Sequence, residues 1–314
     1  MAAHALEPTG ETLHGHFSRE LAPVLRIASH DRVAFRTLDV NWGCFENPDP
    51  FAAPVPWPQR DHGRDPGHAL VGPVWIEGAR AGMTLEVRVH AVRTGRWGWS
   101  GAGGAPTVTN RRLGLAGPPR HVERWALDPD SGWARSARGA RVRMRPFMGI
   151  LGMPPAEPGR HSTVPPRACG GNLDCRELVA GSRLFLPIAV DGALFSTGDG
   201  HALQGDGEVA GPALECPVER AELEFVLHPE QRLARPRAHT PAGWVTFGFD
   251  ADLDEAMAVA LSDMLDLLVE LRGGDRREAL ALASLLVDLR VTQVVNGVRG
   301  VHAIVAHEAL AALG

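Results

Sequence analysis

The chain has 314 residues, 44% of them apolar, which is enough to bury the core of one large domain or two ordinary ones. Its net charge of -5, and the absence of a basic stripe with interleaved aromatic residues, argue against a nucleic-acid partner. No apolar run approaches the roughly 20 residues that a membrane helix needs, and residues 1–10 do not resemble a signal peptide. We therefore expect a cytoplasmic protein without a membrane partner.

The cysteines are not arranged as a metal-binding or redox motif. None of them stands in C-x-x-C spacing, which argues against zinc-ribbon and thioredoxin-type sites. A disulfide framework is also not expected in a chain of this size. We expect reduced and mostly buried thiols at Cys44, Cys169, Cys175 and Cys216.

The first three quarters of the chain are predicted to be mainly β-structure. In residues 83–92, strict alternation directs Leu85 and Val87 toward a core and Glu86 outward. Alternation also predicts strands at residues 31–38 and 221–227, and a short apolar run that ends at the turn signal Asp191-Gly192 predicts one at residues 184–190.

Two Gly/Pro-rich stretches, residues 47–73 and 97–119, interrupt these strands. They are longer than connectors require, so we expect ordered loops that help to form a site.

The pattern changes to helical spacing near residue 251. Gly273 and Gly274 are expected to end a first helix, and the capping-box pair Asp275 and Glu278 to begin a second over residues 276–290. The predicted fold class is mainly β (α+β): a large sandwich- or barrel-like β body with long loops and a C-terminal helical hairpin. One domain over residues 1–314 then comprises a site-bearing body (1–250), a helical hairpin (251–290) and a C-terminal segment (291–314).

The densest group of polar residues lies in residues 196–208. Asp199, His201, Asp206 and Glu208 are separated there by glycines, which let a backbone turn sharply and approach a ligand. Carboxylates and an imidazole suit zinc, calcium or manganese, and they also suit a general base for water. A pair of turns with capping aspartates is the alternative. The two Gly-Asp-Gly units, the histidine between them and the closing glutamate favour a site.

Two weaker clusters accompany this segment. Gly170 and Gly171, followed by Asn172 and Asp174, can offer amides for an oxyanion and a carboxylate ligand, although a helix N-cap is the alternative. His68 stands where a loop enters an apolar strand, a common place for catalytic groups.

Upstream, Asp39 and Asn41 are candidates for the same pocket, although turn formation explains both residues adequately.

Several familiar mechanisms are excluded. The chain contains no lysine, no G-x-S-x-G elbow, no H-E-x-x-H and no Walker-type loop. A cysteine nucleophile at Cys169 or Cys175 stays open, but nothing local marks either thiol as activated. Water activated by a metal ion is the simplest remaining nucleophile.

Segments in one order along the chain resemble the acetamidase/formamidase family. The most specific are Gly170-Gly-Asn-Leu-Asp174 and Gly198-Asp-Gly-His-Ala-Leu-Gln-Gly-Asp-Gly-Glu208. The other similar segments are residues 17–25, 67–79, 149–155, 181–188, 192–197 and 293–296.

The resemblance implies hydrolysis of a short aliphatic amide to ammonia and a carboxylate. It also implies a divalent metal, zinc and/or calcium, and a homo-oligomer, dimeric or higher. Transferred onto this chain, it places His68, Asp174, His201, Asp206 and Glu208 in a polar pocket. The division of roles is our inference from the residue types: Glu208, Asp206 and His68 are catalytic, Gly170, Gly171 and Asn172 bind the oxyanion, and Asp174, Asp199, His201 and Asp206 bind metal.

Other functions remain open beside this one. The Arg- and Trp-rich residues 97–133 depart from the family pattern, which leaves room for another small C–N substrate. A non-catalytic, metal-stabilised protein that binds small ligands is a second alternative. A calcium-stabilised structural protein is a third.

Overall fold

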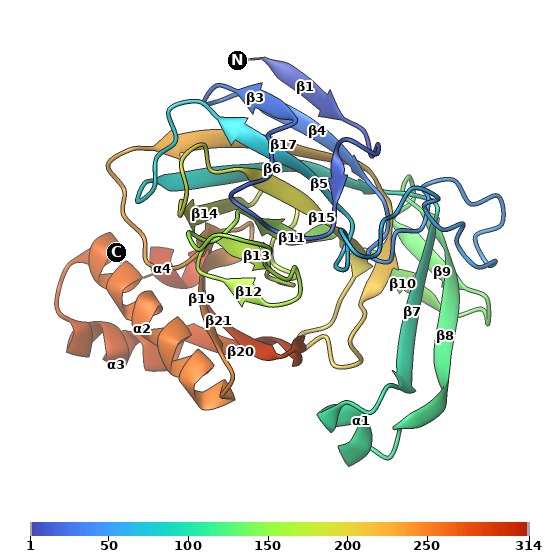
Figure 1. The fold of residues 1–314 in the computed structure, drawn as a ribbon. Helices are drawn as coiled ribbons and strands as arrows, with labels where there is room; N and C mark the ends of the chain where they lie inside the picture. The colour runs from blue at the N-terminus through green and yellow to red at the C-terminus, as the bar shows by residue number, and fades with distance from the viewer. Residues whose placement is uncertain (1, 313–314) are drawn as a thin grey trace.

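Two large β-sheets form most of the computed structural model, which describes residues 2–312 (Figure 1). The first sheet has 9 strands, and it is antiparallel except at β1. In spatial order its strands are β1 (Ala3–Leu6), β4 (Arg32–Thr37), β17 (Val218–His228), β6 (Thr84–Thr94), β14 (Arg183–Pro187), β18 (Arg237–His239), β19 (Gly243–Asp250), β21 (Val298–Ala306) and β20 (Val287–Asn296).

The second sheet has 12 strands. Its main path is β10 (Arg141–Arg143), β9 (Trp133–Ser136), β8 (Gly117–Asp128), β7 (Trp97–Gly104), β16 (Leu214–Cys216), β15 (Phe195–Leu203), β11 (Phe147–Gly152), β13 (Gly170–Asn172) and β12 (Pro166–Arg167). β5 (Leu70–Ile76) pairs with β15 and also with β2 (Leu13–His14) and β3 (Leu25–Ile27).

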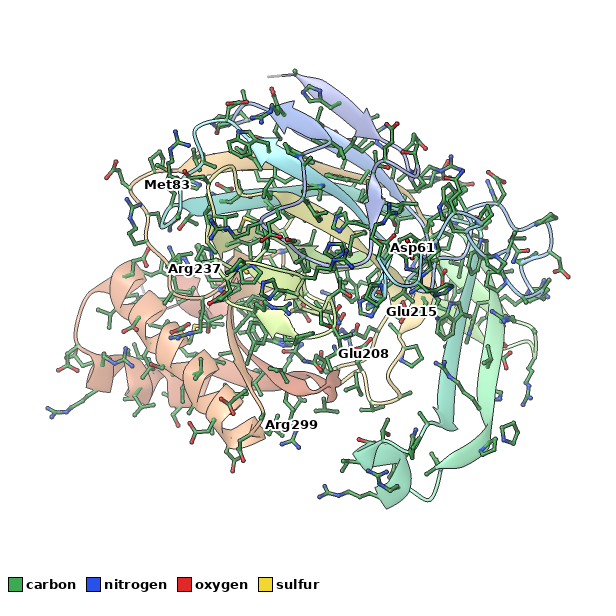
Figure 2. The ribbon with its side chains drawn as sticks, viewed as in Figure 1. Asp61, Met83, Glu208, Glu215, Arg237 and Arg299 are labelled. Carbon is green, nitrogen blue, oxygen red and sulfur yellow. The ribbon has the colours of Figure 1, made fainter. Side chains whose placement is uncertain are left out.

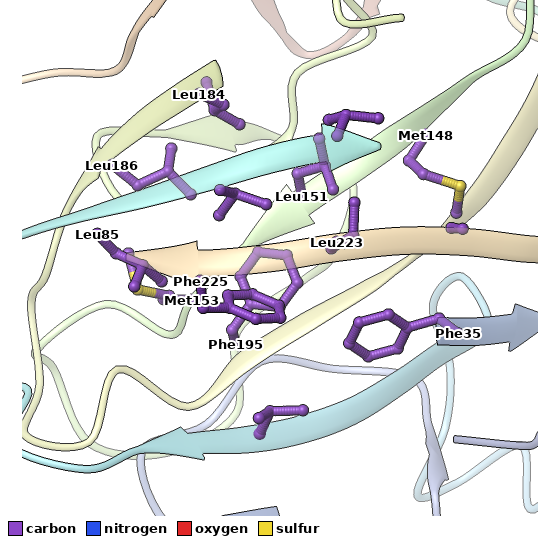
Figure 3. Close-up of a cluster of buried hydrophobic side chains, with 14 of the residues drawn as sticks. Phe35, Leu85, Met148, Leu151, Met153, Leu184, Leu186, Phe195, Leu223 and Phe225 are labelled. Atoms are coloured by element: carbon purple, nitrogen blue, oxygen red, sulfur yellow. The ribbon is translucent and has the colours of Figure 1, made fainter. Parts of the chain in front are cut away.

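The main core lies between the two sheets. Phe35 of β4, Phe195 of β15 and Phe225 of β17 are buried and meet edge to face, with ring centroids 4.9 to 6.3 Å apart (Figure 3). Edge-to-face aromatic pairs add about 0.5–1.5 kcal/mol beyond the area they bury. Because β15 is anchored here through Phe195, the polar residues further along the same strand are held at a fixed depth.

The expected strands and the mainly β fold class are confirmed. Residues 31–38, 83–92, 184–190 and 221–227 overlap β4, β6, β14 and β17. We expected residues 97–119 to form a loop, and this was wrong. They contain β7, the short helix α1 (Val108–Arg112) and the start of β8. These two strands form a hairpin arm that projects from the body with α1 at its tip (Figure 1).

The helical hairpin is also present. α2 (Leu253–Arg272) ends at Gly273, and α3 (Arg276–Leu286) begins with the capping box of Asp275 and Glu278. The second helix was expected to reach residue 290, but β20 begins at Val287 because residues 287–291 pair with β21. α4 (His307–Ala311) follows β21. Cross-strand pairing therefore overrides the local helical pattern.

All four cysteines are free thiols. Cys169, Cys175 and Cys216 are buried, and burial raises the pKa of each thiol, that of Cys169 to about 11. These cysteines are therefore poor candidates for nucleophiles at neutral pH. No helix within residues 2–312 is long and apolar enough to cross a membrane.

Glu86 of β6 faces away from the core as expected, yet its side chain is fully buried. Two arginines and a histidine cover it: Arg88 Nε at 2.7 Å, Arg183 Nε at 2.6 Å and His228 Nε2 at 2.6 Å. Burial raises the pKa of the carboxyl, but the hydrogen bonds from these three side chains outweigh it and hold the pKa at about 2.

We predict that Glu86→Gln lowers the free energy of unfolding at pH 7 by about 1–2 kcal/mol, because two arginines lose their charged partner. The folded pKa lies below the value of 4.5 for a free glutamate, so this stability is present above pH 4.5 and is lost as the pH falls toward 2. Urea unfolding at pH 7 and pH 3 measures both values. A stability difference that does not shrink at pH 3 contradicts the assignment.

Candidate active site

Two neighbouring strands of the 12-stranded sheet carry the centre of the candidate site. β15 supplies Asp199 and His201, and β16 supplies Glu215, which lies opposite His201 in the strand register. His201 Nε2 lies 3.1 Å from Asp199 Oδ1 and 3.3 Å from Glu215 Oε2. All three side chains are buried, so one imidazole is held between two carboxylates away from solvent.

Two further carboxylates approach the same imidazole. Asp174 follows β13, and Glu208 comes from the loop between β15 and β16. The potential ligand atoms of Asp174, Asp199 and His201 lie within 4.8 Å of one another. The same holds for those of His201, Glu208 and Glu215. Glu208 and Glu215 lie between the β body and the arm (Figure 2).

Three of these carboxylates sit on left-handed backbone. The φ angles are +48° at Asp174, +59° at Asp199 and +46° at Glu208. Non-glycine residues rarely adopt this conformation, and where they do they cluster at functional sites. The backbone is therefore bent at three separate places to direct carboxylates toward His201.

Gly149 of β11 provides the room for this convergence. A Cβ atom there would lie 2.8 Å from Asp174 Oδ1, 2.8 Å from Asp199 Oδ2 and 2.9 Å from the His201 ring. Any side chain at this position would push the ligating atoms apart. The edge of the His201 ring rests on Phe147, with ring centroids 5.0 Å apart.

Outer hydrogen bonds fix how these groups are presented. Gln204 Nε2 donates to the carbonyl oxygen of Asp174 at 2.7 Å, so Gln204 Oε1 is the atom that faces His201 Nδ1 at 2.9 Å. This arrangement places the proton of a neutral imidazole on Nδ1 and leaves Nε2 with a free lone pair, as metal-binding histidines require. Asn296, at the end of β20, donates through Nδ2 to Asp174 Oδ2 at 2.7 Å.

The cluster contains four carboxyl groups but only one imidazole, so its negative charge is not fully compensated by the chain. Burial, followed by repulsion from Asp199, raises the pKa of Asp174 to about 8. Burial raises the pKa of Glu215 to about 7, and burial with repulsion from Asp174 raises the pKa of Glu208 well above 4.5. Burial also raises the pKa of Asp199, but the adjacent His201 holds it at about 2. Burial lowers the pKa of His201, but Glu215 and Asp199 raise it well above 6.5.

These residues fit a divalent cation. Asp174 Oδ1 and Glu208 Oε2 are buried and have no hydrogen-bond partner within residues 2–312. Buried oxygens of this kind normally have a partner, and a cation is one. Four carboxylates and one imidazole are hard and borderline donors suited to zinc, calcium or manganese.

A pocket of about 300 Å³ opens above this cluster. Its floor contains Asp199, Glu208 and Glu215, and its walls contain His68 and Asn172. Burial lowers the pKa of His68, so this imidazole is neutral at pH 7, and its Nδ1 atom has no hydrogen-bond partner within the described residues.

Asn172 is oriented by its own contact. Its Nδ2 atom donates to the carbonyl oxygen of Val164 at 3.0 Å, which leaves Oδ1 without a partner in the part of the chain that the structure describes. Asn172 lines the pocket and therefore presents a free acceptor beside the carboxylates.

Three of the residues expected in the site lie outside it. Asp206 is exposed and faces Arg290 at 3.9 Å, because the chain turns through Gly207 (φ +94°) before Glu208 points inward. Gly170 and Gly171 do not line the pocket. They lie in β13 between β11 and β12, where a Cβ at Gly170 would clash with the carbonyl oxygen of Leu151 and lie 3.0 Å from Gly152 Cα.

The sequence did not single out three further residues near the cluster, and it explained a fourth by turn formation. Glu215 is the acidic residue of the short, buried strand β16. An acidic residue between two apolar ones was the sequence feature that could have marked it as a site residue. Gln204 lies inside the Gly/Asp segment, and Asn296 ends a segment that carried the resemblance. Asp39 is buried and accepts the Nε1–H of Trp99 at 2.8 Å, and this holds a wall of the pocket.

Fold and site together define a two-sheet β protein with a pocket over a buried carboxylate–imidazole cluster able to hold a cation. The sequence model of the Acetamidase/Formamidase family matches residues 157–231, which include Asp174, Asp199, His201, Glu208 and Glu215. A segment of 47 residues is 55% identical to the acetamidase of Mycolicibacterium smegmatis. That segment covers 15% of this chain and 12% of the relative.

Solved structures extend the likeness to the whole chain. Acetamidase from Bacillus halodurans is 26% identical with a TM-score of 0.83, over 99% of both chains. Acetamidase from Yersinia enterocolitica is 25% identical with a TM-score of 0.84, over 98% of this chain and 93% of that one. The resemblance to the acetamidase/formamidase family is thereby confirmed, in sequence from residue 157 to 231 and in fold along the whole chain.

We predict that Gly149→Ala weakens binding of a divalent ion by at least about tenfold, because the added methyl group displaces the oxygens of Asp174 and Asp199. Gly205→Ala is the matched control, since a Cβ there meets nothing within 4 Å. Metal content after dialysis against graded metal buffers measures both affinities. Equal affinities in the two variants would show that the cluster is not the metal site.

Proposed function

We propose that the chain is an amidohydrolase that cleaves the C–N bond of a short aliphatic amide and releases ammonia and a carboxylate. The observation that carries the proposal is the buried cluster in which His201 meets four carboxylates beneath an open pocket. The similarity to acetamidases and formamidases supports the same reaction class. The cytoplasmic location and the homo-oligomeric state stay predictions.

We further propose that the cluster holds a divalent metal ion, zinc and/or calcium. Asp174, Asp199 and His201 form one candidate ligand set, and Glu208 and Glu215 complete a second one around the same imidazole. A bound ion of this kind polarises a carbonyl oxygen and lowers the pKa of water. The orphaned Oδ1 atom of Asp174 supports the first of these sets, which leaves Glu208 free to act on water.

Two pocket side chains suit the amide group itself. Asn172 Oδ1 is a free acceptor and can bind an N–H of the substrate. His68 presents Nδ1 without a partner and is neutral, so it can donate to the carbonyl oxygen as charge develops there. These two contacts orient the carbonyl carbon over the floor of the pocket.

Glu208 is the proposed general base. Its carboxylate lies at the pocket floor, and its raised pKa makes it a stronger base than an ordinary glutamate. Glu208 accepts a proton from the attacking water as the C–O bond forms. It then gives this proton to the nitrogen as the C–N bond breaks, so that ammonia leaves and the base is restored.

Ammonia release from formamide, acetamide, propionamide and urea tests the proposal. The protein is assayed as purified, after chelation, and with zinc, calcium or manganese restored. We expect release from at least one short amide, loss of that release on chelation and recovery with one metal. Bound metal without ammonia from any amide would favour a small-ligand binding protein instead.

We predict that Glu208→Gln lowers kcat by about 10²–10⁴-fold, because the proton acceptor is lost, while metal held through Asp174, Asp199 and His201 remains bound. Asp206→Asn, two residues away, is the matched control and should lose less than about threefold, because its side chain is exposed outside the cluster. Steady-state kinetics and metal analysis of both variants measure these effects. A Glu208→Gln enzyme that turns over normally would refute its role.

A further inference from the structure

The pocket is larger than the amides considered so far. Its volume of about 300 Å³ reaches the range of sites that enclose much larger ligands. Formamide and acetamide have only a few non-hydrogen atoms and fill the region next to the carboxylate floor. The rest of the pocket is therefore available to a further part of the substrate.

The arm forms the far wall of this space. β7 and β8 pair along most of their length, and α1 connects them at the tip (Figure 1). Residues from this arm that line the pocket are Trp99, Gly103, Ala105, Thr107, Asn110 and Arg120. These residues belong to the Arg- and Trp-rich segment 97–133, which departs from the family pattern.

Among residues 2–312, Arg120 of β8 is the only arginine that lines the pocket, and the chain has no lysine. Its guanidinium carbon lies 5.1 Å from the centroid of the Trp99 ring. Trp99 is itself buried and anchored through Nε1 to Asp39 at 2.8 Å. Stacking on a fixed aromatic ring holds the guanidinium in place before any ligand arrives.

Glycines in β7 give this side chain its path. A Cβ at Gly101 would lie 3.1 Å from Arg120 Nε, and a Cβ at Gly104 would lie 2.9 Å from Arg120 Cβ. Larger residues at either position would force Arg120 away from β7. The sequence of β7 thus leaves the guanidinium lying across the strand.

Arg120 also has no ion pair within residues 2–312, so no carboxylate of the chain occupies its guanidinium as Asp130 occupies that of Arg93 at 2.6 Å. An unpaired guanidinium that faces a ligand pocket is a binding group for a carboxylate. The acidic floor would repel an anion, so a negatively charged group is directed to the Arg120 side.

We propose, on the basis of the proposed function, that the substrate is a short amide carrying a carboxylate at its other end. The amide lies over the carboxylate floor with Asn172, and the substrate carboxylate binds Arg120. Thr107 and Asn110 line the same wall and offer polar side chains beside this anion. Arg120 is thus a specificity-determining residue for the hydrolysis proposed above.

The test compares ammonia release from succinamate and from butanamide, a neutral amide of the same carbon length, at constant ionic strength. We expect kcat/KM for succinamate to exceed that for butanamide, and the ratio to fall at least about tenfold in Arg120→Gln, which removes charged hydrogen bonds. Arg120→Lys should restore part of the ratio, since it restores the charge without the planar fork. Arg112→Gln, an exposed arginine of the same arm outside the pocket, is the matched control and should leave the ratio unchanged.

The outcomes separate this inference from the function on which it rests. Ammonia from both amides with the same ratio in wild type and Arg120→Gln overturns the role of Arg120 and leaves the amidohydrolase proposal standing. Ammonia from neither amide counts against the proposed function, and calorimetric titration then decides the inference. Succinamate that binds more tightly than butanamide, and loses this advantage in Arg120→Gln, supports it. Equal binding of the two amides overturns it.

Discussion

A buried imidazole surrounded by carboxylates is the constraint on which the rest of this molecule depends. Taking several ionised groups out of water is costly, and their mutual repulsion adds to the cost unless a cation compensates it. His201 supplies one compensating charge when it is protonated, and this accounts for its raised pKa beside Asp199 and Glu215. A divalent ion supplies more charge and gives Asp174 Oδ1 the partner that it lacks within residues 2–312. The cluster is thus built for a cation, and protons fill that role when no metal is bound.

The fold keeps this arrangement in place from three directions. The sheet pairing of β15 with β16 and β11 fixes Asp199, His201 and Glu215. Left-handed backbone turns direct Asp174 and Glu208 inward, and Gly149 leaves the space that they occupy. The β-hairpin of β20 and β21 reaches the cluster through Asn296 of β20, so the segment that follows α2 and α3 belongs to the site as well. Strain of this kind persists only where the surrounding structure determines it fully.

Local sequence patterns were sufficient to predict many of the strands and helices and most residues of the cluster. Alternation identified β4 and β6, the capping box located α3, and the Gly/Asp segment with Asp174 identified most of the cluster. Asp206 and Glu208 were indistinguishable in sequence because the difference between them is a backbone turn at Gly207. Glu215 and the arm depend on hydrogen-bond pairing between separate strands, which no local motif encodes, and pairing of β20 with β21 ended α3 before residue 290. Tertiary contacts therefore decided the features that the sequence left open.

Proton release on metal binding tests the central claim most directly. Metal-free protein is titrated with zinc at pH 7 by calorimetry in two buffers of different ionisation enthalpy. Because the pKa values of Asp174, Glu208 and His201 are raised, the account predicts about one-to-one binding with at least one proton released per ion. Binding without proton release, or no binding to the intact protein, would contradict the claim that this cluster holds a cation.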